Sequence, residues 1–376
     1  MPTTVGILGA GQLGAYLCRA AANLGVKSVV LASRTDEMAA GHADEVIIGA
    51  LGDLACIDQV LEKADVVTFE REDVPADALA HLAREAEKRG VRIAPGVPIL
   101  QLLQNKADQK RWLVDHEIPT APFVRYDDGI SDPSQLVFGP KCVIKHQRGG
   151  YDGLGVAVVD NGDIPSAFAA HPCILEEWVA HELEIAVLVA RSDSGDVRSY
   201  PVFAADFDGR GNVLRQVVCP ADIAEGVADT ARDLAARVVS GLSGVGVFAV
   251  EMFVNGQDVV VNEISPRVHN VGHLTMEASA TSQFEQHVRA VCGMPLGAPE
   301  LVRPAAMNNL LYEPDLDAAC RQKMDLDQSD QGVYVHWYGK SEPRPLRKMG
   351  HLTVVADSTE SAAVRADSSV QQLRAS

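Results

Sequence analysis

Two apolar runs, at 245–254 and 259–264, flank the dipeptide Asn-Gly at 255–256 and predict a β-hairpin. Neither run alternates regularly between apolar and polar residues, so we expect both faces of the hairpin to be buried. Each run nevertheless contains one carboxylate, Glu251 in the first and Glu263 in the second. An unpaired carboxylate is costly to bury, so each needs a cation, a hydrogen-bond donor or a raised pKa.

The geometry of the turn decides whether these two glutamates share a face. A two-residue Asn-Gly loop would put Glu251 and Glu263 on opposite faces. A three-residue loop, or one bulge, would pair Glu251 with Val261 and put both carboxylates on one face, roughly 6–7 Å apart. That arrangement suits a bridging divalent metal, with Asn262 as a neutral oxygen ligand. The alternative, two glutamates without function at solvated strand ends, is disfavoured because further polar residues follow: Arg267, His269 and Asn270.

The size and charge of the chain narrow its partners. Its 376 residues suffice for two or three domains with sizeable cores. The net charge of −18 argues against nucleic acid or an anionic membrane, because both need basic surface. No apolar run reaches the roughly 18 residues of a membrane span, and the N-terminus lacks a signal-peptide layout. Seven scattered cysteines fit reduced thiols, so we expect a cytoplasmic protein.

A βαβ pattern opens the chain, with a strand at 5–8, the glycine motif G-A-G-Q-L-G at 9–14, a helix, and a second strand at 29–31. Such a turn can direct N–H groups at a phosphate, although it can also be purely structural. A nicotinamide dinucleotide site wants an acidic residue at the end of the second strand, and Ala-Ser-Arg stands there instead. NAD is therefore disfavoured, and Arg34 leaves NADP open.

Charged residues follow the next predicted strand, at 64–69, in the segment E-R-E-D-V-P at 70–75. Open α/β sheets bind ligands at the carboxyl ends of parallel strands, so this segment is either a ligand-binding loop or an exposed turn. Helical patterns follow at 76–90 and 99–116. A proline-containing segment at 118–122 then predicts the first domain boundary.

A glycine-rich hairpin is predicted between strands at 142–145 and 156–159. Its four glycines make a mobile turn that can fold over phosphates, with Lys145 in reach of phosphate oxygens. It is not a Walker loop, because no Gly-Lys-Ser/Thr follows and no helix starts there. A later connector at 176–179 can offer backbone groups to an adenine, and Glu184 can take ribose hydroxyls.

The C-terminal half contains two predicted helices, at 223–242 and 275–291, and the only dense basic group of this acidic chain. The basic group follows a predicted strand at 333–338 and consists of Lys340, Arg344, Arg347, Lys348 and His351. Solvated charge is the simplest interpretation. A local phosphate site is more attractive, because the overall charge repels anions.

Several motifs occur in one order along nearly the whole chain. They are G-x-G-Q-L-G at 9–14, T-F-E at 68–70, I-P-T-A-P-F at 118–123, G-G-Y-D-G-x-G at 149–155, N-E-I-S-P-R-V-H-N-x-G-H at 262–273, S-Q-F-E-Q-H at 282–287 and H-W-Y-G-K…R-K-M-G-H at 336–351. With these motifs the chain resembles the ATP-grasp superfamily and, within it, the 5-(carboxyamino)imidazole ribonucleotide synthase family of purine biosynthesis. The combination is highly specific, although single motifs are not.

The resemblance implies an α/β and α+β chain with the ATP-grasp fold. Its parts would be a Rossmann-like N-terminal domain at 1–105, a small lid at 106–180 and a C-terminal mixed-sheet domain at 181–376, with ATP between the last two. The implied enzyme is an ADP-forming carbon–nitrogen ligase. It would phosphorylate bicarbonate to carboxyphosphate and transfer the carboxyl group to the amine of 5-aminoimidazole ribonucleotide. The resemblance also implies two Mg²⁺ ions and a homodimer, and no biotin is expected because no biotin-carrier segment is present.

The same resemblance implies roles for individual residues. The metal ligands would be Glu251 and Glu263. The ATP-binding residues would be Lys106, Lys145, Gly149, Gly150, Gly153, Glu176, Glu177, Trp178, Val179, Glu184 and Asn262. The ribonucleotide would contact Gln12, Leu13, Glu70, Tyr151, Asp152, Lys340, Arg347 and Lys348. The catalytic group around bicarbonate and carboxyphosphate would be Arg267, His269 and Asn270, with Tyr151 and Asp152.

Several residues depart from the family pattern, all of them expected near the acceptor end of the site. Leu154 replaces the usual Lys or Arg, Arg71 and Asp73 occur within the F-E-F-E-N-V-P segment, and Val271 and Leu274 occur in the H-N-S-G-H segment and just after it. We expect Arg71 to supply the cation that Leu154 lacks. A related ATP-grasp ligase with a different amine or carboxylate acceptor therefore stays open.

Two other functions explain less of the sequence. An NADP oxidoreductase would use the glycine turn and Arg34 but leaves Glu251, Glu263 and the glycine-rich hairpin unexplained, so we expect no NADP. A non-catalytic nucleotide-binding protein would leave the two glutamates without a purpose.

Overall fold

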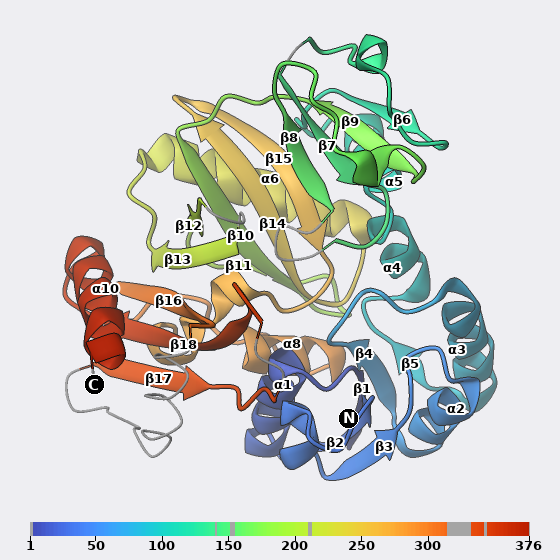
Figure 1. The fold of residues 1–376 in the computed structure, drawn as a ribbon. Helices are drawn as coiled ribbons and strands as arrows, with labels where there is room; N and C mark the ends of the chain where they lie inside the picture. The colour runs from blue at the N-terminus through green and yellow to red at the C-terminus, as the bar shows by residue number, and fades with distance from the viewer. Residues whose placement is uncertain are drawn as a thin grey trace.

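In the described part of the computed structural model, three β-sheets organise the fold: an N-terminal sheet, a sheet in the segment predicted as the lid, here named the lid sheet, and a large C-terminal sheet (Figure 1). The structure describes residues 3–139, 141–150, 155–209, 213–313, 332–341 and 344–375. Within these ranges no helix is long and apolar enough to cross a membrane.

The N-terminal sheet is parallel, with strand order β3-β2-β1-β4-β5. Its strands are β1 (Thr4–Leu8), β2 (Lys27–Ala32), β3 (Glu45–Ile48), β4 (Val66–Phe69) and β5 (Arg92–Ile93). Apolar cores lie on both of its faces, which explains the almost continuous apolar runs of its central strands. The connecting elements are α1 (Gln12–Asn23), η1 (Met38–Gly41), α2 (Leu54–Lys63) and α3 (Ala76–Arg89). The predicted βαβ start is confirmed.

The single helix predicted at 99–116 is wrong, because the structure has two helices there. They are α4 (Val97–Leu103) and α5 (Lys106–Asp115). Asn105 separates them as an N-cap, since its side-chain oxygen accepts hydrogen bonds from two backbone N–H groups of α5, at 2.9 and 3.2 Å. The cap places Lys106 at the first position of the new helix.

The lid sheet is antiparallel, with strand order β6-β9-β7-β8. Its elements are β6 (Phe123–Tyr126), η2 (Pro133–Gln135), β7 (Cys142–His146), β8 (Val156–Val159), η3 (Ser166–Phe168) and β9 (Cys173–Glu177). Side chains alternate across these strands, so Ile144 and Leu175 belong to the apolar core of the lid. Their neighbours Lys145 and Glu176 therefore face the opposite way, where Lys145 contacts the large sheet.

The large sheet has strand order β15-β14-β10-β12-β13-β16-β18-β17, with β11 beside β10. Its strands are β10 (Leu183–Arg191), β11 (Val197–Ser199), β12 (Phe203–Asp208), β13 (Val213–Cys219), β14 (Gly246–Asn255), β15 (Asp258–Ser265), β16 (Ala305–Leu311), β17 (Val333–Trp337) and β18 (Lys348–Val355). The helical elements are α6 (Glu225–Leu242), η4 (Asn270–Gly272), α7 (Thr275–Ala278), α8 (Gln283–Val291) and α10 (Thr359–Ala375). The helix predicted at 275–291 is thus two helices, and Ser282 caps the second.

The predicted hairpin is β14 and β15, and its register decides the placement of the two glutamates. The turn lies at 256–257, one residue later than expected, because Asn255 pairs with Asp258. A bulge then leaves Asn262 without a partner residue, so Glu251 pairs directly with Glu263. The shared face is confirmed, whereas the predicted pairing of Glu251 with Val261 is wrong. Directly opposed residues have Cβ atoms about 4.5–5.5 Å apart, closer than the expected spacing.

Candidate active site

The paired glutamates meet a lysine from the start of α5. The Lys106 ammonium forms an ion pair with Glu263, and Glu251 lies across the hairpin. Burial raises the pKa of Glu251 to about 7, and the charges of Glu263 and Glu184 add to this shift. Burial also opposes ionisation of Glu263, but Lys106 and Lys145 outweigh it and hold its pKa below the ordinary value. One carboxylate is therefore balanced by lysines, and the other needs a cation.

A second charge network lies between the lid sheet and α5. Lys145 Nζ lies 2.9 Å from Glu176 Oε2 and donates to Asn262 Oδ1 at 2.8 Å. Lys110 Nζ lies 3.4 Å from Glu176 Oε1 and donates to the Thr120 hydroxyl at 2.8 Å. Burial lowers the pKa of Lys110 to about 8. The structure thus brings three predicted nucleotide ligands together, with the Glu176 carboxylate between two lysines.

The connector from the lid to the large sheet contains the predicted adenine-binding residues Glu177, Trp178 and Val179. It is anchored by His181, whose ring stacks on Phe253 with centroids 4.4 Å apart. His181 Nε2 lies 3.5 Å from Glu184 Oε1, and burial raises the pKa of Glu184. Because the Glu184 charge also raises the pKa of Glu251, the predicted ribose partner lies near the glutamate pair.

Two predicted catalytic residues lie on the other side of Glu251. The Arg267 guanidinium forms a two-point ion pair with Glu72, from the loop after β4, in which Nη2 donates to Oε1 at 2.9 Å. Burial opposes ionisation of Glu72, yet Arg267 lowers its pKa to about 2. His269 Nε2 lies 3.7 Å from Glu251 Oε1. Burial, together with the nearby Arg267 charge, lowers the pKa of His269 to about 3, so its imidazole is neutral.

Asn270, the third predicted member of this group, points into the protein. Its side-chain amide exchanges two hydrogen bonds with Asn309 on β16, at 2.7 and 3.1 Å. The backbone at His269 is extended, with φ −131° and ψ 157°, so successive side chains alternate. Val268 and Asn270 are buried while Arg267 and His269 face the site. Its predicted place in the group around bicarbonate stays a prediction, and the bonds to Asn309 are an additional contact.

The glycine turn before α1 surrounds a carboxylate of its own chain. A Cβ at Gly9 or Gly11 would lie 2.5 Å from a carboxylate oxygen of Glu70. Burial raises the pKa of Glu70, while the Arg267 charge and the Gly11 N–H oppose the shift. Glu70 therefore lies where such turns hold a phosphate, which explains the glycines without a dinucleotide. The first two residues of α1 are the predicted ribonucleotide contacts Gln12 and Leu13.

The basic group after β17 lies beside the N-terminal region. Lys340 Nζ donates to the carbonyl oxygen of Lys348 at 2.8 Å. Ser341 bridges to the loop after β2, where its hydroxyl lies 3.3 Å from Arg34 Nη2 and 3.1 Å from Asp36 Oδ2. This contact brings together the N-terminal region and the stretch that carries the predicted phosphate contacts Lys340, Arg347 and Lys348.

Part of the glycine-rich hairpin cannot be placed, because Tyr151, Asp152, Gly153 and Leu154 lie outside the described residues. The glycines on either side adopt positive φ angles, 72° at Gly149, 83° at Gly150 and 74° at Gly155. Only glycine adopts such angles readily, so the sequence of this hairpin matches its backbone. The roles predicted for the four central residues stay predictions.

Sequence reasoning missed two charged residues of this site, Lys110 and Glu72. Lys110 follows Lys106 by four residues, which puts both on one face of α5, and both are buried. That spacing was the available signal, because two lysines on a buried helix face need anions. Glu72 stands two residues after Glu70 in the charged loop. Nothing local distinguishes it from Asp73, since its partner Arg267 is distant in sequence.

Known proteins match the chain along its whole length. Family models match in order, with the Ribonucleotide synthetase preATP-grasp domain at 1–104, the ATP-grasp domain at 111–284 and the Phosphoribosylaminoimidazole carboxylase C-terminal domain at 305–365. The N5-carboxyaminoimidazole ribonucleotide synthase of Synechococcus elongatus is 36% identical over 367 residues, which cover 95% of this chain and 91% of that protein. The chain belongs to the N5-carboxyaminoimidazole ribonucleotide synthase family.

Other members of the family agree in sequence and in fold. The synthase of Bacillus subtilis is 34% identical over 360 residues, which cover 93% of this chain and 90% of that protein. The Thermotoga maritima synthetase structure has a TM-score of 0.84 at 35% identity and covers 98% of both chains. An Aspergillus clavatus synthase, solved in complex with ADP and 5-aminoimidazole ribonucleotide, has a TM-score of 0.86 at 30% identity, covering 99% of this chain and 98% of that one. The predicted ATP-grasp fold is confirmed.

Two of the departures from the family pattern lie in the protein core. Val271 and Leu274 are 1% and 0% exposed and pack in the apolar cluster of the large sheet. Val271 lies in η4 and Leu274 is the N-cap of α7. Their expected place near the acceptor stays a prediction. Arg71 pairs with Asp73 in the exposed loop after β4, where its Nε donates to Oδ1 at 2.9 Å. Leu154 lies outside the described residues.

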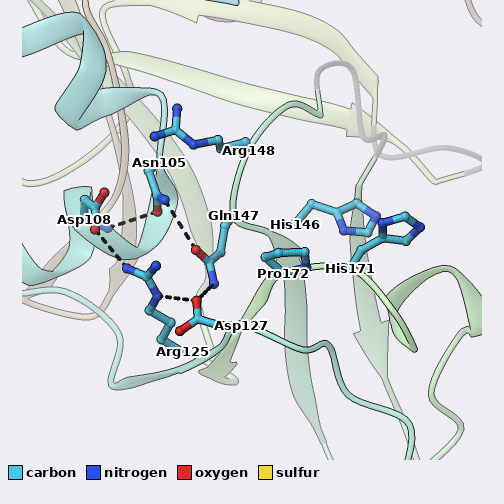
Figure 2. A pocket seen from close by; sticks show the side chains of 9 residues that line it. All are labelled: Asn105, Asp108, Arg125, Asp127, His146, Gln147, Arg148, His171 and Pro172. Atoms are coloured by element: carbon cyan, nitrogen blue, oxygen red, sulfur yellow. Dashed lines mark hydrogen bonds and ion pairs between the residues drawn. The ribbon is translucent and has the colours of Figure 1, made fainter. Parts of the chain in front are cut away.

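A cavity of about 620 Å³ lies at the end of the lid sheet beside α5 (Figure 2). It is lined by Asn105, Asp108, Arg125, Asp127, His146, Gln147, Arg148, His171 and Pro172. Its charged groups largely neutralise one another, as the dashed lines in Figure 2 show. Arg125 donates to Asp127 at 2.7 Å and to Asp108 at 3.2 Å. None of its lining residues belongs to the set predicted for the family site.

Proposed function

We propose that the chain is a ligase that carboxylates 5-aminoimidazole ribonucleotide, using ATP and bicarbonate, to 5-(carboxyamino)imidazole ribonucleotide in purine biosynthesis. The observation that carries this proposal is the direct pairing of Glu251 with Glu263. The pair has nucleotide-side lysines on one flank and Arg267 with His269 on the other. Phosphoryl transfer from ATP to bicarbonate would take place between these two groups of residues. Family membership gives the acceptor.

The nucleotide end supports ATP binding by position and charge. Lys106 and Lys145 would meet phosphate oxygens once these compete with Glu263 and Glu176 for the ammonium groups. The described residues contain no group of three or more His, Cys, Asp or Glu side chains suited to a metal. Two carboxylates nevertheless fit Mg²⁺, which completes its shell with water and phosphate oxygens. Glu251 and Glu263 would hold it, and bound Mg²⁺ neutralises phosphate charge. Two ions belong to this proposal.

Carboxyphosphate would form from ATP and bicarbonate, and carboxyl transfer would follow beside Arg267 and His269. A bicarbonate oxygen attacks the γ-phosphorus of ATP, ADP leaves, and carboxyphosphate forms. The carbon–oxygen bond to the phosphate then breaks, and the amine of the ribonucleotide forms a bond to that carbon and loses a proton to the released phosphate. Arg267 would hold the anionic carboxyphosphate, and the neutral imidazole of His269 would accept or donate a hydrogen bond without adding charge.

Other features of the proposal rest on family membership and on charge. The substrates are small molecules, and we propose neither a nucleic acid nor a membrane partner for a chain with a net charge of −18. The homodimer, the cytoplasmic location and the domain limits at 105 and 180 remain proposals. Glu70 in the glycine turn supports the absence of NADP, because its carboxylate would repel a phosphate there.

The test is ADP release by the purified protein with Mg-ATP and bicarbonate, with and without 5-aminoimidazole ribonucleotide. Strong stimulation that requires both bicarbonate and the ribonucleotide supports the proposal. Basal ATP hydrolysis with no stimulation at millimolar ribonucleotide would leave only an ATP-grasp ligase with a different acceptor. The Arg71–Asp73 ion pair favours testing that second function. Arg71 is the cation expected to compensate for Leu154, where the family has lysine or arginine, and Asp73 competes for it.

A further inference from the structure

Gln283 makes two hydrogen bonds to the backbone of His269. Its Oε1 accepts from the His269 N–H at 2.8 Å, and its Nε2 donates to the His269 carbonyl oxygen at 2.7 Å. The Gln283 side chain is fully buried, with 0% exposure. This side-chain amide therefore satisfies both backbone groups of one residue, as a neighbouring strand would do.

The imidazole of His269 lacks comparable restraint of its own. Its Nε2 lies 3.7 Å from Glu251 Oε1, which is longer than a hydrogen bond. Its buried Nδ1 has no hydrogen-bond partner among the described protein groups. The direction of the ring is consequently set by the backbone at His269, where side chains alternate between the site and the core. A rotated backbone would carry the imidazole away from Glu251.

The position of Gln283 is in turn determined by its surroundings. Its backbone N–H donates to the Thr275 hydroxyl at 2.9 Å, and that hydroxyl donates to the Gly272 carbonyl oxygen at 2.6 Å. A Cβ at Gly272 would lie 2.6 Å from the Gln283 amide, so glycine leaves the space that this amide fills. The Gln283 amide and the loop it holds therefore form one packed unit.

We infer that Gln283 is a positioning residue, which holds the His269 imidazole beside Glu251 for carboxyl transfer. The inference rests on the proposed function for the role of His269. Gln283 lies on α8, away from the lysines at the nucleotide end. Its loss should therefore impair carboxylation much more than ATP binding, and carboxyphosphate formed without a well-placed acceptor site is lost to water.

The same helix supplies a matched control. Gln286 is also 0% exposed and also holds a backbone by two hydrogen bonds, accepting from the Gly297 N–H at 2.7 Å and donating to the Gly297 carbonyl oxygen at 2.9 Å. Gly297 belongs to the segment after α8, where the atoms nearest to a Cβ at this position would be those of Thr281. Gln286→Leu thus removes two side-chain-to-backbone hydrogen bonds of the same kind as Gln283→Leu, but only Gln283→Leu removes the bonds to His269.

The experiment compares Gln283→Leu, Gln283→Glu and Gln286→Leu with the wild type. We expect the two leucine variants to lower Tm by similar amounts. Gln283→Leu should lower kcat for carboxylation roughly 100-fold, because a displacement of about 1 Å costs that much, while KM for ATP stays within about twofold. It should also release more than one ADP per carboxylated product. Gln283→Glu keeps the acceptor for the His269 N–H, so its kcat for carboxylation should lie between those of the wild type and Gln283→Leu.

The outcomes separate the inference from the proposed function. Equal losses of kcat in Gln283→Leu and Gln286→Leu, or a Gln283→Leu defect confined to KM for ATP, would overturn the positioning role. Failure of the wild type to carboxylate the ribonucleotide would overturn the proposed function instead. In that case a crystal structure of Gln283→Leu still decides the matter, since we expect its imidazole to have left Glu251. An unmoved imidazole would contradict the inference.

Discussion

The nucleotide end and the acceptor end of the site differ in the origin of their charged residues. At the nucleotide end, Lys106 pairs with Glu263 and Lys145 pairs with Glu176, and all four belong to helices or strands. At the acceptor end, Arg267 pairs with Glu72, and both belong to loops. Charges within regular elements have their directions set by the backbone. The directions of charged side chains in loops depend on contacts between distant segments. The charged residues at the acceptor end can therefore vary while the nucleotide end keeps its chemistry.

The largest effect should come from Glu263→Gln at the nucleotide end. It removes one of two opposed carboxylates and leaves the buried Lys106 without its anion. We expect ADP release to fall at least about 1000-fold with the fold intact by circular dichroism, because several kcal/mol of metal and phosphate stabilisation is lost. Asp258→Asn, at the exposed start of β15, is the control. Turnover retained in Glu263→Gln would refute the metal assignment.

Glu72→Gln tests the acceptor end. It leaves the partly buried Arg267 without its carboxylate, which is costly and frees the guanidinium to move. Carboxylation should fall about 100-fold while KM for ATP changes little, because a loop charge has lost the contact that directs it. Asp258→Asn, at the exposed start of β15, is again the control. A rise in KM for ATP that matches the loss in turnover would show that the two ends are not separable.

The pH dependence of Mg²⁺ binding should reveal the raised pKa of Glu251. The metal needs the ionised carboxylate, and this group is half protonated near pH 7 in the free protein. Apparent Mg²⁺ affinity should therefore drop by up to about tenfold for each pH unit below 7. Because the folded pKa lies above the unfolded value, the metal-free protein should lose stability as pH rises from about 4.5 to 7. Affinity that is flat from pH 6 to 8 would contradict this.

The smallest effect should come from Arg71→Ala. Arg71 is half exposed and already pairs with Asp73, so its contribution to holding the ribonucleotide is reduced by water and by that competition. We expect KM for 5-aminoimidazole ribonucleotide to rise about three- to tenfold with KM for ATP unchanged. Leu154→Lys should lower the same KM if position 154 faces the acceptor. If KM for 5-aminoimidazole ribonucleotide is unchanged in both variants, both residues lie outside the acceptor end.

Sequence reasoning performed differently at the two ends for physical reasons. The glutamates of the hairpin stood out because carboxylates in apolar strands demand an explanation, and strand alternation predicted a common face only with a three-residue loop or a bulge. Their direct pairing did not, because a turn shifted by one residue and a bulge at Asn262 are decided by packing. Lys110 and Glu72 were missed because their partners, Glu176 and Arg267, lie far away in the sequence.

The sequence also did not predict the breaks in two helices or which loop side chains face the core. Asn105 divides the helix predicted at 99–116, because it is the N-cap of α5. A single capping residue is a weak signal within a continuous helical pattern. The contact of Asn270 with Asn309 was not predicted, because Asn309 is distant in sequence and alternation along an extended loop directs Asn270 toward it. In an extended loop, a contact with a distant segment decides which alternate side chains face the core. The loop sequence alone does not reveal which residue makes that contact.

The most direct test of the account is the fate of ¹³C-labelled bicarbonate in the wild-type reaction, followed by NMR with ADP measured in parallel. The account predicts that Mg-ATP and 5-aminoimidazole ribonucleotide together move the label into a carboxylated amine, with one ADP formed for each labelled product. Label that stays in bicarbonate while ATP is hydrolysed at an unchanged rate would contradict it.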